Sequence, residues 1–360
     1  MTRQLPIARG SWADEELALR PPAGLGAPAG PLRDADGRSI RYVRISVTDR
    51  CDLRCVYCMP LGGETEHGTR PEILTFEEIA RLVRVLAQGG VRRARFTGGE
   101  PLLRKDVVEL VALVHRFAPE VDLCLTTNGT KLERLAADLF RAGLRRLNVS
   151  LDTLDPDRFR ETTRGGDLAR VIAGFDAAQR AGFDDVALNV VAMRGTNDDE
   201  IPALVDWSWA RGIEPRFIEL MPIGEGAKLA ADRQIGWREI AVRLGSRIDL
   251  AGVDRPQGRG PAFYVPAADG SGRRVGFITA ITESFCETCN RIRVTARGDL
   301  RACLASRRAI SLRDAMRAGL GDDEILGQVA WALGQKEVGH HFDSTDIDEH
   351  ERVGMSLIGG

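Results

Sequence analysis

The chain has 360 residues, of which 43% are hydrophobic and 28% charged, and its formal net charge is -2. This composition is typical of a globular protein with a sizeable core, and it excludes a general attraction to nucleic acid or anionic membranes. The pI near 6.3 and the 6% aromatic content also argue against a nucleic-acid partner. With neither a signal-peptide pattern nor a membrane-length apolar run, the sequence predicts a cytoplasmic protein without a membrane partner.

Residues 1–38 include RPPAGLGAPAGPLRDADG, a segment crowded with proline and glycine. Such a segment carries too little apolar surface to offset the entropy lost on ordering. We therefore expect these residues to form a flexible N-terminal tail.

Beyond the tail, strand patterns occur at residues 40–48, 93–97, 122–127, 146–151, 185–192 and 215–220, and a helical pattern follows each of the first five. The first helix begins with a capping box, Thr75 and Glu78. Glycines that suit helix ends stand at positions 90, 143, 182 and 212.

Strands that alternate with helices predict a parallel sheet curled into part of a barrel. The fold class is therefore α/β, with a partial (βα)6 TIM-like barrel over residues 39–244. Functional residues are expected at the carboxyl ends of its strands. From about residue 245 the alternation stops, and residues 245–360 are expected to form an α+β extension packed on the barrel.

Three of the seven cysteines, Cys51, Cys55 and Cys58, fall within the segment CDLRCVYC. On a helix or in a loop, this spacing brings the thiols to one side. A zinc site would need a fourth ligand from elsewhere, whereas a 4Fe–4S cluster held by three thiolates keeps one iron open to a small molecule. Arg50 and Arg54 either lower the thiol pKa values or are merely solvated.

The C-x-x-x-C-x-x-C spacing, with Tyr57 before its last cysteine, resembles the signature of the radical S-adenosylmethionine (SAM) superfamily. The segment FTGGEPLLR, residues 96–104, resembles the SAM-binding loop of that superfamily. The resemblance implies that the open iron binds SAM and that an electron from the cluster generates a 5′-deoxyadenosyl radical, which takes hydrogen from a substrate. It assigns SAM contacts to Tyr57, Gly99, Ser150 and Met221.

A second cysteine group, Cys286, Cys289 and Cys303, lies in FCETCNRIRVTARGDLRACL. A structural zinc knuckle is the alternative reading. The pattern C-x2-C-N-R-x-R followed by C-x13-C resembles the C-terminal cluster of the GTP 3′,8-cyclase family, which catalyses the first step of molybdenum-cofactor biosynthesis. The resemblance runs from about Arg41 to the C-terminus. It implies a second 4Fe–4S cluster, which holds the guanine of GTP.

Arg291 and Arg293 alternate along an extended segment, so they point the same way and suit charge-assisted contacts to a triphosphate. A solvated strand face is the alternative. The resemblance assigns the GTP contacts to Arg44, Arg95, Thr126, Arg291 and Arg293.

One position departs from the family pattern. Ala187 stands where the family usually has a lysine, so one triphosphate contact is expected to be missing. At the C-terminus, Gly359 and Gly360 match a family tail that reaches the active site and is required for turnover. Their lack of side chains suits a crowded pocket wall.

The resemblance implies cyclisation of GTP to (8S)-3′,8-cyclo-7,8-dihydroguanosine 5′-triphosphate, which begins with hydrogen abstraction from ribose C3′. It also implies an external one-electron reductant and product transfer to cyclic pyranopterin monophosphate synthase, and it allows a homodimer. Two alternatives remain: a radical SAM enzyme that modifies a peptide, and a structural zinc-binding protein. The peptide enzyme would usually carry more C-terminal cysteines and no R-x-R segment.

Overall fold

The computed structural model describes residues 18–62, 67–255, 260–306, 308–337, 339, 342 and 355. Its centre is an 11-stranded sheet in the order β11-β10-β9-β1-β2-β3-β4-β5-β6-β8-β7. The six expected strands are β1 (Tyr42–Ser46), β2 (Arg93–Thr97), β3 (Asp122–Thr127), β4 (Arg146–Ser150), β5 (Asp185–Ala192) and β6 (Glu214–Glu219). They are parallel and pair in chain order.

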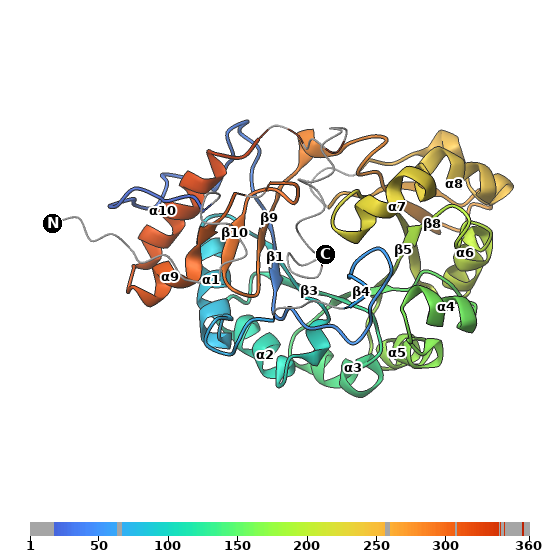
Figure 1. Cartoon of the computed structure of the whole chain (residues 1–360), viewed down its shortest axis with the longest axis horizontal. Coiled ribbons are helices and arrows are strands. Elements are labelled where there is room, and N and C mark those ends of the chain that lie inside the picture. Colours follow the sequence, from blue (N-terminus) through green and yellow to red (C-terminus); the bar gives the residue numbers. More distant parts are fainter. Residues whose placement is uncertain are drawn as a thin grey trace.

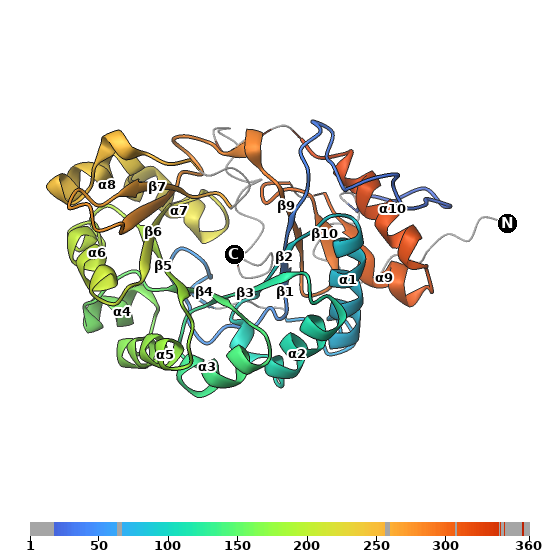
Figure 2. The same ribbon diagram turned by 180° about the vertical axis from the view of Figure 1, so that it is seen from behind.

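Helices cover the outer side of this curved sheet (Figures 1 and 2). They are α1 (Phe76–Gln88), α2 (Val107–Phe117), α3 (Leu132–Arg141), α4 (Pro156–Thr162), α5 (Leu168–Arg180) and α6 (Ile201–Ala210), and β6 leads into α7 (Glu225–Arg233) and α8 (Trp237–Leu244). The partial (βα)6 barrel is thus confirmed.

The start of α1 illustrates how local sequence sets an element. Thr75 Oγ1 accepts a hydrogen bond from the Glu78 amide at 3.2 Å, and the Glu78 carboxylate accepts one from the Thr75 amide at 2.8 Å. The predicted capping box is therefore present. Ile79, Val83 and Leu86 lie one or two turns apart on the face that is buried against the sheet.

The side chains of each strand alternate between two environments. On β3, Leu123 and Leu125 are fully or almost fully buried beneath the helices, whereas Thr126 lines a cavity on the concave side. On β1, Val43 and Ile45 are buried, whereas Arg44 lines the same cavity. The hydrophobic core therefore lies between the sheet and the helices, and the concave side is polar.

The C-terminal extension continues this sheet at both of its edges. On one side it adds β8 (Arg274–Ile278), parallel to β6, and then β7 (Phe263–Pro266). On the other it adds β9 (Arg291–Val294), parallel to β1, followed by β10 (Asp299–Arg301), β11 (Ile310–Ser311), α9 (Leu312–Arg317) and α10 (Asp322–Leu333). The point near residue 245 therefore ends the β/α alternation without interrupting the sheet.

The expectation of a mobile tail does not hold for residues 18–38. Leu32 is fully buried, and its amide donates to the Gly89 carbonyl at 2.7 Å. A Cβ placed on Gly89 would lie 2.8 Å from both Leu32 and Leu326, so α1, α10 and this segment pack tightly together. The burial of Leu32 and its backbone hydrogen bond to Gly89 order this segment despite its high content of proline and glycine. Residues 1–17 lie outside the described residues.

Among the residues described, none of the helices combines the length and the hydropathy needed to cross a bilayer.

Replacing Leu32 with alanine should lower the free energy of unfolding by about 2–5 kcal/mol, because the change opens a cavity between α1 and α10. Leu61→Ala is the matched control, since Leu61 is 77% exposed and its truncation should cost less than about 0.5 kcal/mol. Urea unfolding followed by circular dichroism compares the two variants. Equal midpoints for both would mean that the segment around residue 32 is not packed in solution.

Candidate active site

The concave side of the sheet holds a cavity of about 1210 Å³. Both cysteine groups line it, as do all the residues predicted to contact SAM or GTP. The lining side chains come from the inward face of the strands along their whole length, from the loops after their carboxyl ends and from the C-terminal extension. The cavity therefore includes the carboxyl ends expected of a barrel enzyme but also extends beyond them. The volume exceeds that of a usual single-ligand pocket, so the cavity has room for two ligands side by side.

The first cysteine group occupies the loop between β1 and α1. The amide of Cys58 donates to the Cys55 carbonyl at 3.0 Å, which makes a turn and not the helix that the spacing also allowed. Burial raises the pKa of Cys51 to about 12, and burial together with the neighbouring thiols raises the pKa of Cys55. Burial is thus the largest cause at both thiols, and neither Arg50 nor Arg54 is among the groups that shift these two pKa values.

The arrangement of these three thiols suits a cluster better than a single metal ion. No three Cys, His, Asp or Glu side chains within the described ranges gather tightly enough to hold a single ion. A 4Fe–4S cluster does not require such convergence, because each cysteine binds a separate iron. Cys51, Cys55 and Cys58 all face the cavity from one loop, so this donor set fits such a cluster.

The segment after β2 is threaded closely against the cysteine loop. A Cβ on Gly99 would lie 2.4 Å from the Arg50 carbonyl oxygen, and one on Gly98 would lie 2.5 Å from that of Thr48. The amide of Glu100 donates to the Arg50 carbonyl at 2.7 Å. Both glycines are therefore required by the close approach of two backbones.

The carboxylate of Glu100 ties this segment to the end of β3. It accepts hydrogen bonds from the Leu102 amide at 2.9 Å, the Thr127 hydroxyl at 2.8 Å and the Asn128 amide at 2.6 Å. Burial raises its pKa to about 7, against the opposing effect of these hydrogen bonds. The side chain of Asn128 also donates to Cys51 Sγ at 3.9 Å. The sequence did not assign a role to Asn128, although the polar residues TTNG at the end of this strand indicated a functional segment.

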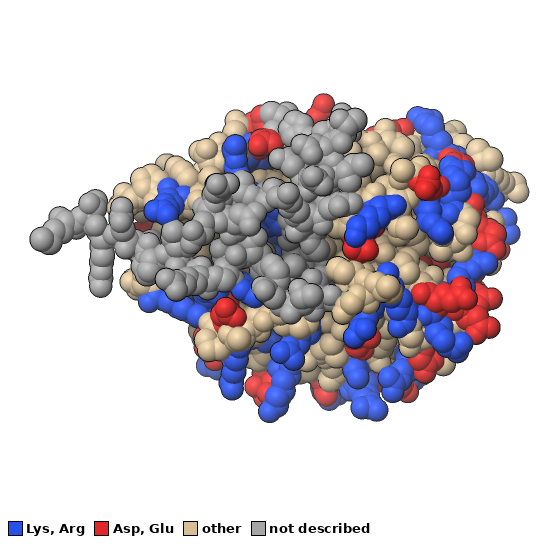
Figure 3. Space-filling model, in the orientation of Figure 1, with Lys and Arg blue, Asp and Glu red and all other residues tan. Residues whose placement is uncertain are grey.

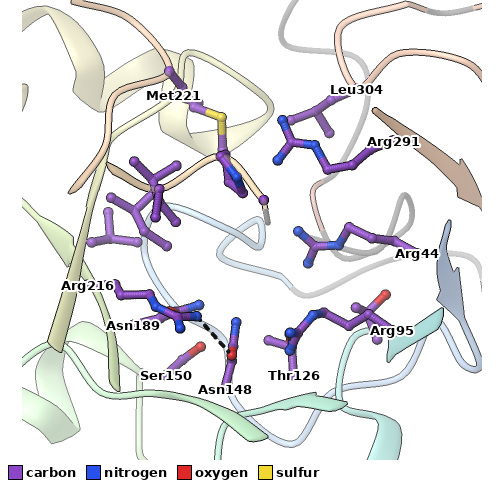
Figure 4. A pocket seen from close by; sticks show the side chains of 18 of the residues that line it. Arg44, Arg95, Thr126, Asn148, Ser150, Asn189, Arg216, Met221, Arg291 and Leu304 are labelled. Atoms are coloured by element: carbon purple, nitrogen blue, oxygen red, sulfur yellow. Dashed lines mark hydrogen bonds between the residues drawn. The ribbon is translucent and has the colours of Figure 1, made fainter. Parts of the chain in front are cut away.

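Three of the predicted SAM contacts approach the cavity from different places, Tyr57 from the cysteine loop and Ser150 and Met221 from strand ends. Tyr57 donates from its hydroxyl to Asp152 at 2.7 Å, and the same carboxylate accepts the Val191 amide at 2.8 Å, so the phenol is held in place. Ser150 ends β4, and Met221 follows β6. Figure 4 shows Ser150 and Met221 on different sides of the cavity.

The second cysteine group lies near the amino end of β1, whereas the first group follows its carboxyl end. Cys286 begins a 3-10 turn, and the Cys289 amide donates to its carbonyl at 3.1 Å. Cys303 follows β10, which pairs antiparallel with β9 and so returns the chain to this turn. Burial raises the pKa of Cys289, but Arg291 and Lys336 outweigh it and bring the value down to about 7.

Four arginines, called here the arginine group, come from three adjacent strands: Arg44, Arg95, Arg291 and Arg293. Arg44 is the register partner of both Arg95 and Arg293. Burial, reinforced by Arg95 and Arg291, lowers the pKa of Arg44 to about 10, and the pKa of Arg293 is also lowered. Such crowded cations favour a polyanionic ligand. Arg95 also donates to the Thr126 hydroxyl at 3.4 Å.

Another arginine faces this group across the cavity (Figure 4). Arg216 on β6 donates to the Asn148 amide oxygen at 3.3 Å and to Glu214 at 2.8 Å. Asn148 and Glu214 are the register partners of Ala187 on either side, so Arg216 reaches across the site of the absent lysine. Arg216 was not predicted from the sequence. Its position on the strand that leads to Met221 could have indicated that it faces the same cavity.

On the outer surface, charges of both signs are interspersed along the lower and right-hand parts of the face in Figure 3. The four arginines of the arginine group, by contrast, all line the cavity. Gly359 and Gly360 lie outside the described residues, but Phe342 and Met355 line the cavity.

Residues 45–208 match the family model described as Radical SAM superfamily, and residues 213–342 match Molybdenum Cofactor Synthesis C. The GTP 3′,8-cyclase of Caulobacter vibrioides is 46% identical over 335 residues, which is 91% of this chain and 94% of that protein. The GTP 3′,8-cyclase of Nitrobacter hamburgensis is 44% identical over 334 residues, 91% of this chain and 95% of that protein.

Among solved structures, Streptococcus suis SuiB bound to S-adenosylmethionine aligns with a TM-score of 0.55 at 16% identity. The alignment covers 89% of this chain and 65% of SuiB, so the chain spans just under two thirds of that protein. At this identity the likeness shows the fold alone, and it agrees with the partial barrel.

Gly99→Ala should weaken SAM binding by roughly 5- to 150-fold, because the new methyl group would push against the Arg50 carbonyl and move the cysteine loop at a cost of about 1–3 kcal/mol. Gly30→Ala is the control, since no atom lies within 4 Å of a Cβ at that position. Equilibrium dialysis with labelled SAM measures the affinity. Wild-type affinity in Gly99→Ala would contradict the close packing described.

Proposed function

The chain belongs to the GTP 3′,8-cyclase family of the radical SAM superfamily, and we propose that it converts GTP to (8S)-3′,8-cyclo-7,8-dihydroguanosine 5′-triphosphate, the first step of molybdenum-cofactor biosynthesis. It is a radical SAM enzyme, with SAM and a 4Fe–4S cluster as cofactors. One observation carries the substrate assignment: the two cysteine groups and the arginine group share a single cavity.

When bound, the 4Fe–4S cluster supplies the electron that cleaves SAM. Cys51, Cys55 and Cys58 would hold it in the loop after β1. The glycine backbone at position 99 lies against that loop and lines the cavity, where it would contact the amino-acid part of SAM. Tyr57, held by Asp152 in the cysteine loop, together with Ser150 and Met221 from two strand ends, would contact the rest of SAM.

We assign the triphosphate of GTP to the arginine group. Arginine donates two parallel hydrogen bonds to a phosphate, and in a cavity screened from water such contacts are strong. Thr126 lies beside Arg95 and would add a neutral contact. Burial, with repulsion between the arginines added to it, lowers the pKa values of Arg44 and Arg293, and a triphosphate would relieve that repulsion.

We further propose that Cys286, Cys289 and Cys303 hold a second 4Fe–4S cluster, with the guanine of GTP beside it. The three thiols line the cavity next to the arginine group, which supports this assignment. No fourth cysteine accompanies them in the 285–304 segment, so one iron would stay open to a purine atom.

Arg216 is our candidate for the cation that replaces the lysine absent at position 187. Its guanidinium reaches over Ala187 to Asn148, and Glu214 orients it. Arginine presents a planar fork where lysine presents a point charge, so the triphosphate would be held with a different geometry.

We also propose that an external reductant supplies single electrons, that the product passes to cyclic pyranopterin monophosphate synthase, and that the protein is a cytoplasmic homodimer. We propose a barrel over residues 39–244 that is joined to an extension over residues 245–360. A role for the tail that ends in Gly359 and Gly360 is supported by Phe342 and Met355, which line the cavity. A peptide-modifying enzyme is not favoured, because relatives of nearly equal length are cyclases.

Anaerobic reconstitution with iron and sulfide, followed by reduction with SAM and GTP present, should yield 5′-deoxyadenosine and the 3′,8-cyclised nucleotide. Cys55→Ser should reduce both products to background, because the cluster loses a ligand. Cys124→Ala should keep them, since Cys124 is buried in β3 outside both cysteine groups. Bound zinc without 5′-deoxyadenosine, or turnover with a peptide and not with GTP, would refute the proposed function.

Arg216→Gln should raise the KM for GTP by roughly 10- to 100-fold, because a charge-assisted contact worth about 1.5–3 kcal/mol is lost. Glu214 keeps Arg274 as a partner at 2.5 Å, so no isolated carboxylate is left behind. Arg247→Gln is the matched control, since Arg247 forms an exposed ion pair with Asp206.

The same experiment includes a rescue variant. Adding Ala187→Lys to Arg216→Gln should restore most of the GTP affinity, while the affinity for SAM stays constant throughout. An unchanged KM in Arg216→Gln, or a parallel loss of SAM affinity, would refute the phosphate role of Arg216.

A further inference from the structure

A buried ionic network lies beneath the second cysteine group, outside the cavity lining. Its centre is Asp34, whose carboxylate is completely buried and accepts hydrogen bonds from the amide and from Nε of Arg38, at 3.0 Å and 2.7 Å. The same carboxylate pairs with Lys336 Nζ at 3.3 Å, and the Lys336 side chain is only 2% exposed. We call Asp34, Arg38 and Lys336 the Asp34 network.

Both cations of this network continue to the cysteine turn. Lys336 Nζ donates to Cys289 Sγ at 3.8 Å. Arg38 Nη1 donates to the Cys286 carbonyl oxygen at 2.7 Å. One carboxylate therefore holds two cations, each of which contacts a different cysteine of the turn.

The network joins three parts of the chain. Asp34 and Arg38 precede β1, the cysteine turn precedes β9, and Lys336 follows α10. The turn is also tied to this segment by the Asn290 carbonyl, which accepts the amides of Arg41 and Tyr42 at 3.1 Å and 3.2 Å. This explains why residues that look like a tail in composition are packed in the structure.

Burying a lysine is costly unless a carboxylate compensates for its desolvation. Asp34 provides that compensation and leaves donors of Lys336 available to the sulfur of Cys289. Hydrogen bonds to cluster sulfurs and the net charge around a cluster are among the factors that set its reduction potential. A cation at this sulfur favours the more negative, reduced form, whereas the carboxylate behind it opposes that effect.

We propose that Asp34 is a positioning residue that holds Lys336 and Arg38 against the second cysteine group, and that this network sets the reduction potential of the cluster bound there. The inference rests on the second cluster of the proposed function. Neither Asp34 nor Lys336 lines the cavity, so both act through the cysteines and not through the nucleotide.

The test measures the potential of each cluster in the reconstituted full-length chain by redox titration monitored by electron paramagnetic resonance. Asp34→Asn keeps a side-chain oxygen that can accept from Lys336 and Arg38 but removes the negative charge, so it should raise the potential of the second cluster. Lys336→Met removes a positive charge together with the contact to sulfur and should lower it. The potential of the first cluster should not move in either variant.

Asp36→Asn is the matched control, because Asp36 pairs with the same Arg38 at 2.7 Å but is 34% exposed. Asp36→Asn removes one negative charge just as Asp34→Asn does, but from a side chain that solvent and salt screen. Its effect on the potential should therefore be much smaller than that of Asp34→Asn. Lys336→Arg retains the charge and should stay closer to wild type than Lys336→Met.

Potentials that shift in the same direction in Asp34→Asn and Lys336→Met, or that do not shift, would overturn the inference. Loss of iron from the second site in both variants would also overturn it, since the role would then be purely structural. The iron content of the wild type tests the premise separately: about four irons per chain in place of about eight would mean that there is no second cluster.

Discussion

The structure depends on the two-residue alternation of its parallel strands. In a closed barrel the inward positions are filled with branched apolar side chains. Here the inward positions on adjoining strands include Arg44, Arg95, Asn148, Asn189 and Arg216. The outward positions carry nearly all the apolar packing, against a layer of helices. The sheet is thus stabilised from one side, which leaves the other side free to be a polar cavity.

The arginines that suit the cavity to bind an anion also lower the stability of the fold. Buried guanidinium groups are costly, and the lowered pKa values of Arg44 and Arg293 reflect burial together with repulsion between neighbours. Cations lie on facing walls of the cavity: the arginine group near β1, and Arg216 across the cavity with Glu214 beside it. A polyanion between the walls would compensate both, which is why the electrostatics and the family point to the same substrate.

Local patterns predicted the local features of this chain. The strands over residues 93–97, 122–127 and 185–192 have the expected bounds, and Thr75 and Glu78 form the expected capping box. Features that depend on distant pairing were not predictable. Leu32 and Asp34 lie in a Pro/Gly-rich segment, yet their partners come from α1, α10 and the segment after it. Similarly, Arg216 is recognisable beside Ala187 only once the register of β5 and β6 is known.

The pairing of β1 with β9 connects these features. The first cysteine loop follows the carboxyl end of β1, whereas the second cysteine turn precedes the amino end of β9. Because these two strands are parallel and Tyr42 is opposite Arg291, the cysteine groups must lie at opposite ends of one short ladder. A rise of about 3.3 Å per residue makes this five-residue strand roughly 13 Å long between its end Cα atoms. The arginine group lies along that length, so the spacing between the two cysteine groups of the cavity is set by backbone pairing.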